Sequence, residues 1–482
     1  MNNRISASIV ILLVLFCLGS LAVMCVTAGV LWQTTSSTSP TPLSVVDTPT
    51  PSHSATLLPT QSSEPATAAV GETPLPSLTP SRLVEDPAIV RQMEEIERQV
   101  SALRGLPLLQ PVQRRLMNGE ELRRHVEEDF LQDYSAEEAA EDALILSVFG
   151  LLEKDYDLLD LYLELYSEQI AGFYDSETKE MYVVQGESFG GMERSTYAHE
   201  FTHALQDQHY NLREGLKVNP DYCKEDSEYC AAVQSLVEGD ASLTEQYWLY
   251  QHGTEQDRRD IETFYENYSS PVLDAAPSFL QEDFAFPYRE GVEFVLTLFQ
   301  ENGYEAIDAA FANPPVTTEM ILHPEKYPAD RPAVIDLPAV EEALGRPVKE
   351  LDRGVMGEWY TYLILAHGLE EEWRIADELA RQAAAGWDGD AYAVYWDETA
   401  AQPLMLLLSE WESERDAGEF RQALTAYARL RWGEADQQDV QRGYLWEETA
   451  DGVVFFQQRG AQTLWLIAPR EADIPLLKPA GW

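Results

Sequence analysis

The chain has 482 residues, and 45% of them are hydrophobic, which at roughly 150 residues per domain allows two or three folded units. Its 83 Asp and Glu residues outnumber 33 Lys and Arg residues, giving a formal net charge of -50. Such a field repels the phosphate backbone of nucleic acids, so we expect no nucleic-acid partner. Four cysteines are too few for a disulfide-dense scaffold.

A membrane anchor is expected first along the chain, at residues 1–33. The stretch from Ile5 to Trp32 carries no charge and is long enough to cross a bilayer as a helix. Arg4 precedes it and no charged residue follows until Asp47, so the positive-inside rule places the N-terminus in the cytoplasm and the rest of the chain outside. A cleaved or lipidated start is the alternative, although the apolar run is long for a signal peptide.

A disordered stalk is expected next, over residues 34–82, because 30 of these 49 residues are Ser, Thr or Pro. Beyond the stalk the patterns predict an α+β fold in two parts. A mainly helical domain with a short strand region would occupy residues 83–349, and a smaller α+β unit residues 350–482. The helices at 83–165 are either part of the first domain or a removable pro-segment.

Helices should dominate the first third of the folded chain. Apolar residues at helical spacing predict helices at Pro87–Val100 and Ala136–Leu152, with Asp86 and Ser135 as their N-caps. A β-hairpin is expected next, with strands at residues 171–175 and 181–184 on either side of a polar turn.

Towards the C-terminus, apolar and β-branched runs predict three strands, Leu404–Leu408, Gly452–Phe456 and Thr463–Ile467, with a helix at Asp416–Leu430. Gly386–Tyr392 is expected to form a turn that leads into a strand. Calcium binding by the two aspartates of this segment is the less favoured interpretation.

One short motif carries metal chemistry. His199 and His203 are four residues apart, so on a helix they share a face and both imidazoles can reach one ion. Glu200 lies beside that face, where a carboxylate can act as a general base without ligating the metal. Two surface histidines are the alternative, but the apolar neighbours Tyr197 and Phe201 favour a buried helix, where unpartnered imidazoles would be costly. The motif predicts one catalytic zinc ion, although ligand type alone does not exclude other divalent ions.

A zinc site of this kind needs a third protein ligand. A helix is predicted at residues 231–249, and Glu238 lies among its apolar positions. An acid there is either a metal ligand or a core carboxylate with other partners. We favour Glu238 as the third ligand, with Asp240 and Glu245 as substitutes.

These residues resemble the gluzincin branch of zinc metallopeptidases, in which H-E-x-x-H and a Glu from a following helix hold the metal. The resemblance puts His199, His203 and Glu238 in the ligand positions and Glu200 in the general-base position. It also puts Met181–Val184 in the place of the edge strand that precedes the active-site helix.

The whole ectodomain also resembles uncharacterised bacterial predicted metallopeptidases, through A-G-F-Y-D at 171–175, H-A-L-Q-D-Q at 203–208, E-G-D-A at 238–241 and L-H-P-E-K-Y at 322–327. One departure concerns the support of the ligands. Many gluzincins have an Asp three or four residues after the Glu ligand, where it orients a histidine, but Ala241 and Ser242 stand here. Asp240 or Asp207 are the alternatives for that role.

The resemblance implies a zincin-like metallopeptidase domain that hydrolyses protein or peptide substrates, and the predicted anchor would place this domain on the outer side of the membrane. Tyr288 and His323 are the candidate donors to the oxyanion, although a tyrosine is more often a core or turn aromatic and a histidine before proline more often a loop residue. Substrate backbone would pair with the edge strand. The alternative is a catalytically inactive surface binding protein on a zincin scaffold, which has little reason to keep Glu200.

Cys223 and Cys230 lie between the two helices expected to hold the metal, and outside the membrane in this topology. A disulfide between them is favoured over two free thiols. The six residues between them fit zinc-thiolate spacings poorly.

Overall fold

The computed structural model describes residues 82–84, 86–131, 134–184, 189–438, 443–479 and 481–482. The predicted anchor and the predicted stalk as far as residue 81 lie outside the described residues. Within the described ranges, no helix is both long and apolar enough to cross a bilayer.

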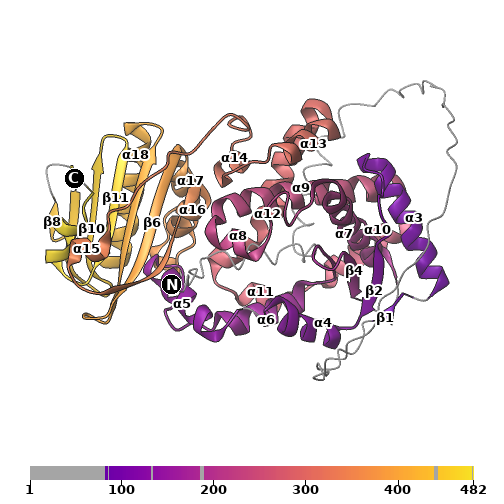
Figure 1. Cartoon of the computed structure of the whole chain (residues 1–482), viewed down its shortest axis with the longest axis horizontal. Coiled ribbons are helices and arrows are strands. Elements are labelled where there is room, and N and C mark those ends of the chain that lie inside the picture. Colours follow the sequence, from indigo (N-terminus) through magenta and orange to yellow (C-terminus); the bar gives the residue numbers. More distant parts are fainter. Residues whose placement is uncertain (1–81, 85, 132–133, 185–188, 439–442, 480) are drawn as a thin grey trace, which may run out of the picture.

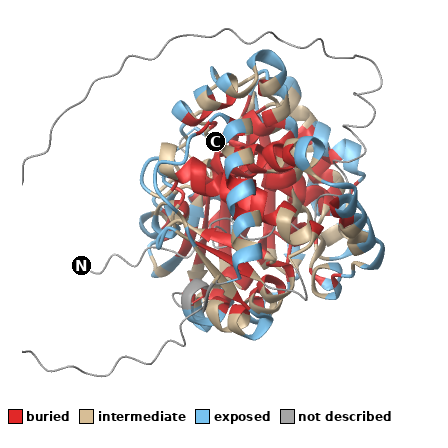
Figure 2. Cartoon of the chain, turned by 90° about the vertical axis from the view of Figure 1, so that its right-hand side faces the viewer, coloured by how far each residue is buried: buried red, intermediate tan, exposed pale blue. Residues whose placement is uncertain are grey.

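The fold is α+β, as predicted, with one four-stranded and one seven-stranded sheet in the described chain. Figure 1 shows the seven-stranded sheet at one end of the molecule and the helices of the first part at the other. Figure 2 looks onto the helical part, where buried residues gather in the middle and exposed residues lie on the outer helices.

The first part contains the small sheet and most of the helices. Its elements are β1 (Arg82–Leu83), α3 (Pro87–Arg104), β2 (Gln113–Met117), α4 (Gly119–His125), a π-helical turn (Val126–Phe130), α5 (Ala136–Val148), α6 (Leu158–Gln169), β3 (Gly172–Asp175), β4 (Glu180–Val184), α7 (Gly191–Tyr210), α8 (Pro220–Glu225), α9 (Ser227–His252), α10 (Glu255–Asn267), α11 (Pro271–Ala275), α12 (Ser278–Asn302), α13 (Tyr304–Ala312) and α14 (Thr318–Leu322).

The second part is built on the large sheet. Its elements are α15 (Val340–Leu344), β5 (Val348–Gly354), α16 (Gly357–Ala366), a 3-10 turn (Glu371–Trp373), α17 (Asp377–Ala384), β6 (Trp387–Asp397), β7 (Gln402–Trp411), α18 (Glu414–Trp432), β8 (Gln437–Gln438), β9 (Gly443–Thr449), β10 (Gly452–Arg459), β11 (Gln462–Ala468), a second 3-10 turn (Glu471–Asp473) and α19 (Ile474–Leu477). The three predicted strands and the predicted helix near the C-terminus are confirmed within β7, β10, β11 and α18.

The two predicted N-caps are confirmed. The side chain of Asp86 accepts a hydrogen bond from the Ala88 backbone N–H, and Ser135 forms a capping box with Glu138. The helix after Ser135 ends at Val148, short of the predicted Leu152, because Gly150 takes a left-handed conformation with φ 79° that ends the helical path.

The small sheet has the order β1-β2-β4-β3, and this corrects the expected edge strand. The hairpin of β3 and β4 is present as predicted. Met181–Val184 lies in β4, however, which pairs with β3 on one side and, in parallel, with β2 on the other. The edge next to α7 is therefore β3. The expectation was wrong because β2, with the polar start Gln113-Arg114-Arg115, carries little strand signal.

The large sheet is covered on both faces, because alternate residues along each strand point to opposite sides. One face packs against α16, α17 and α18 through residues such as Tyr392, Leu407 and Trp465. The other packs against the short helices α15 and α19 through residues such as Ala393, Leu406 and Leu464. The predicted turn at Gly386 leads into β6, and Asp390 from that segment accepts hydrogen bonds from the backbone N–H groups of Met356 and Gly357.

One apolar cluster runs through both parts, from Met117 of the small sheet to Ile467 of the large one. Phe149, just beyond α5, packs its ring edge-on against Tyr392 and Trp465 of the large sheet. The two parts therefore share a core instead of meeting across a polar interface.

Candidate metal centre

Three helices place the candidate metal-binding side chains. The central segment of α7, from Ser195 to Asp207, is buried without interruption. It packs against α9, which in turn crosses α12 so closely that a Cβ on Gly239 would lie 2.2 Å from the Gly291 carbonyl oxygen. Glu238, next to this crossing, is thereby held against α7.

The two histidines of the motif converge on one carboxylate oxygen. Glu238 Oε2 lies 3.1 Å from His199 Nε2 and 3.4 Å from His203 Nε2. All three side chains are at most 1% exposed. Of the three candidates for the third ligand, Glu238 is the one whose carboxylate reaches both Nε2 atoms.

The arrangement fits a divalent ion. Ligands about 2.0–2.1 Å from a tetrahedral zinc stand about 3.3 Å apart, close to the separations observed here. Within the described part of the chain, three buried atoms of the cluster lack a hydrogen-bond partner: His203 Nε2, Glu200 Oε1 and Glu238 Oε1. Leaving them so would be costly, and an ion with a bound water would satisfy them. His199, Glu200 and His203 also form a group whose ligand atoms all lie within 4.8 Å of one another.

His199 is oriented by Glu245, which the sequence suggested only as a substitute ligand. Glu245 Oε2 lies 3.2 Å from His199 Nδ1, on the side of the ring away from Glu238, and Ser195 Oγ donates to the other carboxylate oxygen at 2.7 Å. Because a carboxylate only accepts, Glu245 keeps a ring proton on Nδ1, so Nε2 is the nitrogen that a metal between the ring and Glu238 would use.

His203 is oriented by Gln206, a residue that the sequence analysis did not identify. Gln206 Oε1 lies 2.9 Å from His203 Nδ1, and Gln206 Nε2 donates to Asp240 Oδ2 at 2.9 Å. Asp240 therefore contacts His203 only through Gln206, which makes it a support for a candidate ligand. Asp207, the other alternative for this role, binds the Tyr174 hydroxyl and Lys179 instead.

Glu200 has one carboxylate oxygen held by a hydrogen bond and, within the described residues, one without a partner, as a general base requires. The backbone N–H of Tyr174, on the edge strand β3, donates to Glu200 Oε2 at 3.1 Å and leaves the buried Oε1 without a hydrogen-bond partner in the described part of the chain. Burial raises the pKa of Glu200 to about 7, against the opposing charges of His203 and His199. Burial acts on Glu238 too, but the two imidazoles outweigh it and lower its pKa to about 2. The two neighbouring carboxylates therefore differ in pKa.

The two predicted oxyanion donors lie in different places. Tyr288 on α12 is buried, and its ring centroid is 6.4 Å from that of His199. His323 follows α14, and its Nε2 lies 2.9 Å from Glu358 Oε1. Among the described residues, no contact links His323 to the metal-binding side chains. The structure therefore brings Tyr288 to the cluster but not His323.

The predicted disulfide is confirmed: Cys223 in α8 and Cys230 in α9 are bonded across seven positions of sequence. Both cysteines are fully buried. The bond ties the connection before α9 to the first turn of the helix that carries Glu238.

Comparison with known proteins reaches only the second part of the chain. A family model described as a domain of unknown function, DUF8575, matches residues 346–478, which include every strand of the large sheet and none of the metal-binding side chains. Neither the curated proteins nor the solved structures yield a match.

Proposed function

We propose that the protein is a zinc-dependent metallopeptidase with a gluzincin-like site, anchored in the membrane by its N-terminal segment and facing outward. The observation that carries the proposal is the convergence of His199 Nε2 and His203 Nε2 on Glu238 Oε2, at 3.1 and 3.4 Å, in a fully buried setting. Each histidine also has a partner on Nδ1 that leaves Nε2 available for the ion.

A bound zinc ion would polarise the scissile carbonyl and lower the pKa of a coordinated water. Glu200 would accept the proton of the attacking water at Oε1 while its other oxygen stays bonded to the Tyr174 N–H. As the C–O bond forms and the C–N bond breaks, Glu200 would return that proton to the leaving nitrogen. Tyr288 would donate its hydroxyl proton in a hydrogen bond to the oxyanion.

Strand β3 would align the substrate. Antiparallel strands alternate inward and outward backbone groups, and the Tyr174 N–H points away from β4 towards Glu200. An extended peptide lying along this edge would therefore pass beside the general base. Backbone pairing of this kind gives affinity without fixing sequence, which favours proteins or peptides as the substrate class.

A second candidate is a binding protein whose metal site only stabilises the fold. The burial of the cluster favours it, because His199, Glu200, His203 and Glu238 are each at most 1% exposed. Structural zinc sites are closed, whereas catalytic sites keep a position open to water and substrate. A peptidase with this site must open before a substrate can enter.

The substitution Glu200→Gln separates the two candidates. The amide keeps the size of the side chain but cannot accept the water proton, so we expect full zinc content and a loss of peptide hydrolysis of roughly 10²- to 10⁴-fold. Glu177→Gln, on the exposed turn between β3 and β4, is the matched control and should hydrolyse like the wild type. Equal turnover by Glu200→Gln and wild type would refute the role of Glu200. Zinc without turnover in the wild type would favour the binding protein.

A further inference from the structure

The surroundings of His203 extend to a buried arginine on the first helix of the folded chain. We infer that Gln206, Asp240 and Arg104, which we call the positioning relay, fix the ring of His203 so that its Nε2 faces the metal. The inference rests on the proposed function. It adds positioning residues from α3, far from the motif in sequence, to the zinc site.

The partners of Gln206 decide which way its amide points. Gln206 Nε2 lies 3.0 Å from the Val237 carbonyl oxygen and 2.9 Å from Asp240 Oδ2. Both partners only accept hydrogen bonds, so the amide nitrogen must face them and the amide oxygen must face His203. His203 Nδ1 then has to be the donor across the 2.9 Å contact with Gln206 Oε1. Nε2, the atom next to Glu238, is then the ring nitrogen left to face a metal.

Asp240 is held in turn by Arg104. The Arg104 Nε atom lies 2.8 and 3.0 Å from the two oxygens of Asp240, and both side chains are completely buried. The guanidinium also lies 2.7 Å from Asp308 and 4.7 Å from the centroid of the Tyr304 ring. Asp240 and Asp308 outweigh the burial of the guanidinium and raise the pKa of Arg104, so it stays charged. Removing Arg104 would leave the Asp240 carboxylate buried without its counter-ion, so the ion pair keeps Asp240 in place.

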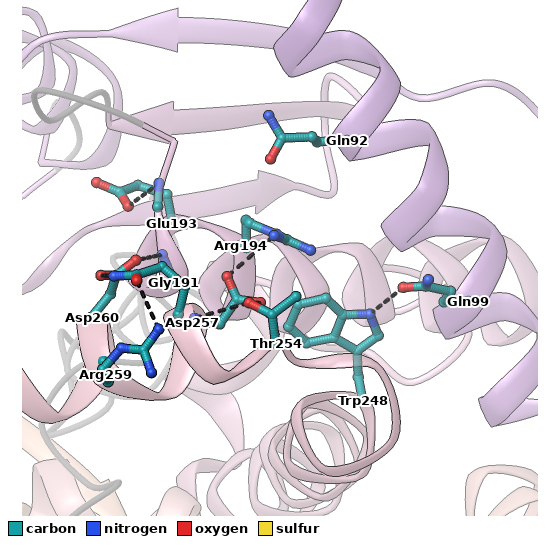
Figure 3. Close-up of polar contacts among 12 residues, drawn as sticks. Gln92, Gln99, Gly191, Glu193, Arg194, Trp248, Thr254, Asp257, Arg259 and Asp260 are labelled. Atoms are coloured by element: carbon teal, nitrogen blue, oxygen red, sulfur yellow. Dashed lines mark hydrogen bonds and ion pairs between the residues drawn. The ribbon is translucent and has the colours of Figure 1, made fainter.

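Helix α3 is fixed to the site by further contacts. Gln99 Oε1 accepts from Trp248 Nε1 on α9 at 2.9 Å, a contact visible in Figure 3. Glu97 accepts from Tyr197 on α7 and from Arg114 on β2. Helix α3 supplies Arg104, one partner of the buried ion pair behind His203, and therefore belongs to the same folded domain as the candidate metal site. This favours an integral role for α3 over a removable pro-segment.

The test compares zinc affinity of the full-length chain and three variants, measured by competition with a chromophoric chelator. Gln206→Met keeps the side-chain volume but removes the acceptor for His203, and should weaken the zinc Kd by roughly 10- to 100-fold. Arg104→Met should also weaken zinc binding, because Asp240 loses the partner that holds it in place. Gln92→Met is the control on the same helix: it removes only a hydrogen bond to the Ala88 carbonyl within α3, and should leave the Kd unchanged.

Equal zinc affinity of Gln206→Met and wild type would overturn the relay while leaving the proposed function intact. A wild type that binds no zinc would overturn both. Because Arg104→Met risks unfolding, the nitrogen-15 resonances of histidine in the zinc-loaded wild type provide a second measurement, with His203 assigned by substitution. We expect the ring proton of His203 on Nδ1. Its presence on Nε2 would overturn the relay without any variant.

Discussion

The crossing of α9 and α12 offers a test of how packing holds the metal site. A Cβ on Gly239 would lie 2.2 Å from the Gly291 carbonyl oxygen, and a Cβ on Gly291 would lie 2.3 Å from the Ser235 carbonyl oxygen. Ordinary van der Waals contact begins at 3.4 Å. Both obstacles are backbone atoms, so they cannot swing aside as a side chain could. Either Gly→Ala substitution must force the two helices apart.

Two opposing effects set the size of the change. Alanine in a helix interior is more favourable than glycine by about 1 kcal/mol. Overpacking costs about 1–3 kcal/mol, and a clash between two backbones belongs at the upper end of that range. We therefore expect Gly291→Ala to lower the free energy of unfolding by about 2 kcal/mol. Zinc affinity should fall as well, because Glu238 lies on α9 at the crossing.

Gly418 on α18 provides the matched control. A Cβ there would meet its nearest neighbours, two atoms of the Gln458 side chain, at 3.9 Å. Gly418→Ala should therefore raise the stability by about 0.5–1 kcal/mol. Urea unfolding followed by circular dichroism, together with chelator competition for zinc, measures both variants. A Gly291→Ala protein with unchanged stability and zinc affinity would refute the close crossing.

Three further predictions concern substitutions of two carboxylates, Glu238 and Asp283, and of one hydroxyl, that of Tyr288. Glu238→Ala should bind zinc far more weakly than wild type in the chelator assay; full retention would remove Glu238 from the ligand set. Tyr288→Phe keeps the ring but removes the hydroxyl donor, so peptide turnover should fall by roughly 10²- to 10³-fold while the zinc content stays unchanged. A Tyr288→Phe variant that turns over peptide as fast as wild type would show that the hydroxyl is not used. Burial raises the pKa of Asp283 to about 6, from 3.8, so between these pH values the folded state keeps a proton that the unfolded state has lost. The free energy of unfolding should therefore decrease by about 3 kcal/mol as the pH rises through that window. In urea unfolding at several pH values, Asp283→Asn should make this pH dependence weaker. An unchanged pH dependence in the variant would contradict the raised pKa of Asp283.

Local patterns predicted the helices that carry the candidate ligands, and they offered Asp240 as a supporting residue, but they did not identify Gln206 or Arg104. Helical spacing and a rare pair of histidines identified α7, and an acid among apolar residues identified Glu238. The disulfide followed from two cysteines in one short segment. Each of these signals lies within a few turns of the chain.

The missed features depend on contacts between distant segments. Arg104 ends a helix with a charge that suits the helix dipole, so its sequence position gives no hint that Asp240 binds it across 136 residues. Strand β2 is polar in sequence because Arg114 and Arg115 pair with Glu97 and Glu180. Gln206 lies three residues after His203, on the same helix face, and that spacing was the one available clue.

The measurement that tests the central claim most directly combines metal content and turnover. The purified full-length chain in detergent would be analysed for metals and incubated with a mixed peptide digest, beside a His199→Ala/His203→Ala variant. We predict one zinc per chain and peptide cleavage that a chelator abolishes, with both lost in the variant. A wild-type chain without zinc, or with the same zinc content as the variant, would contradict the account.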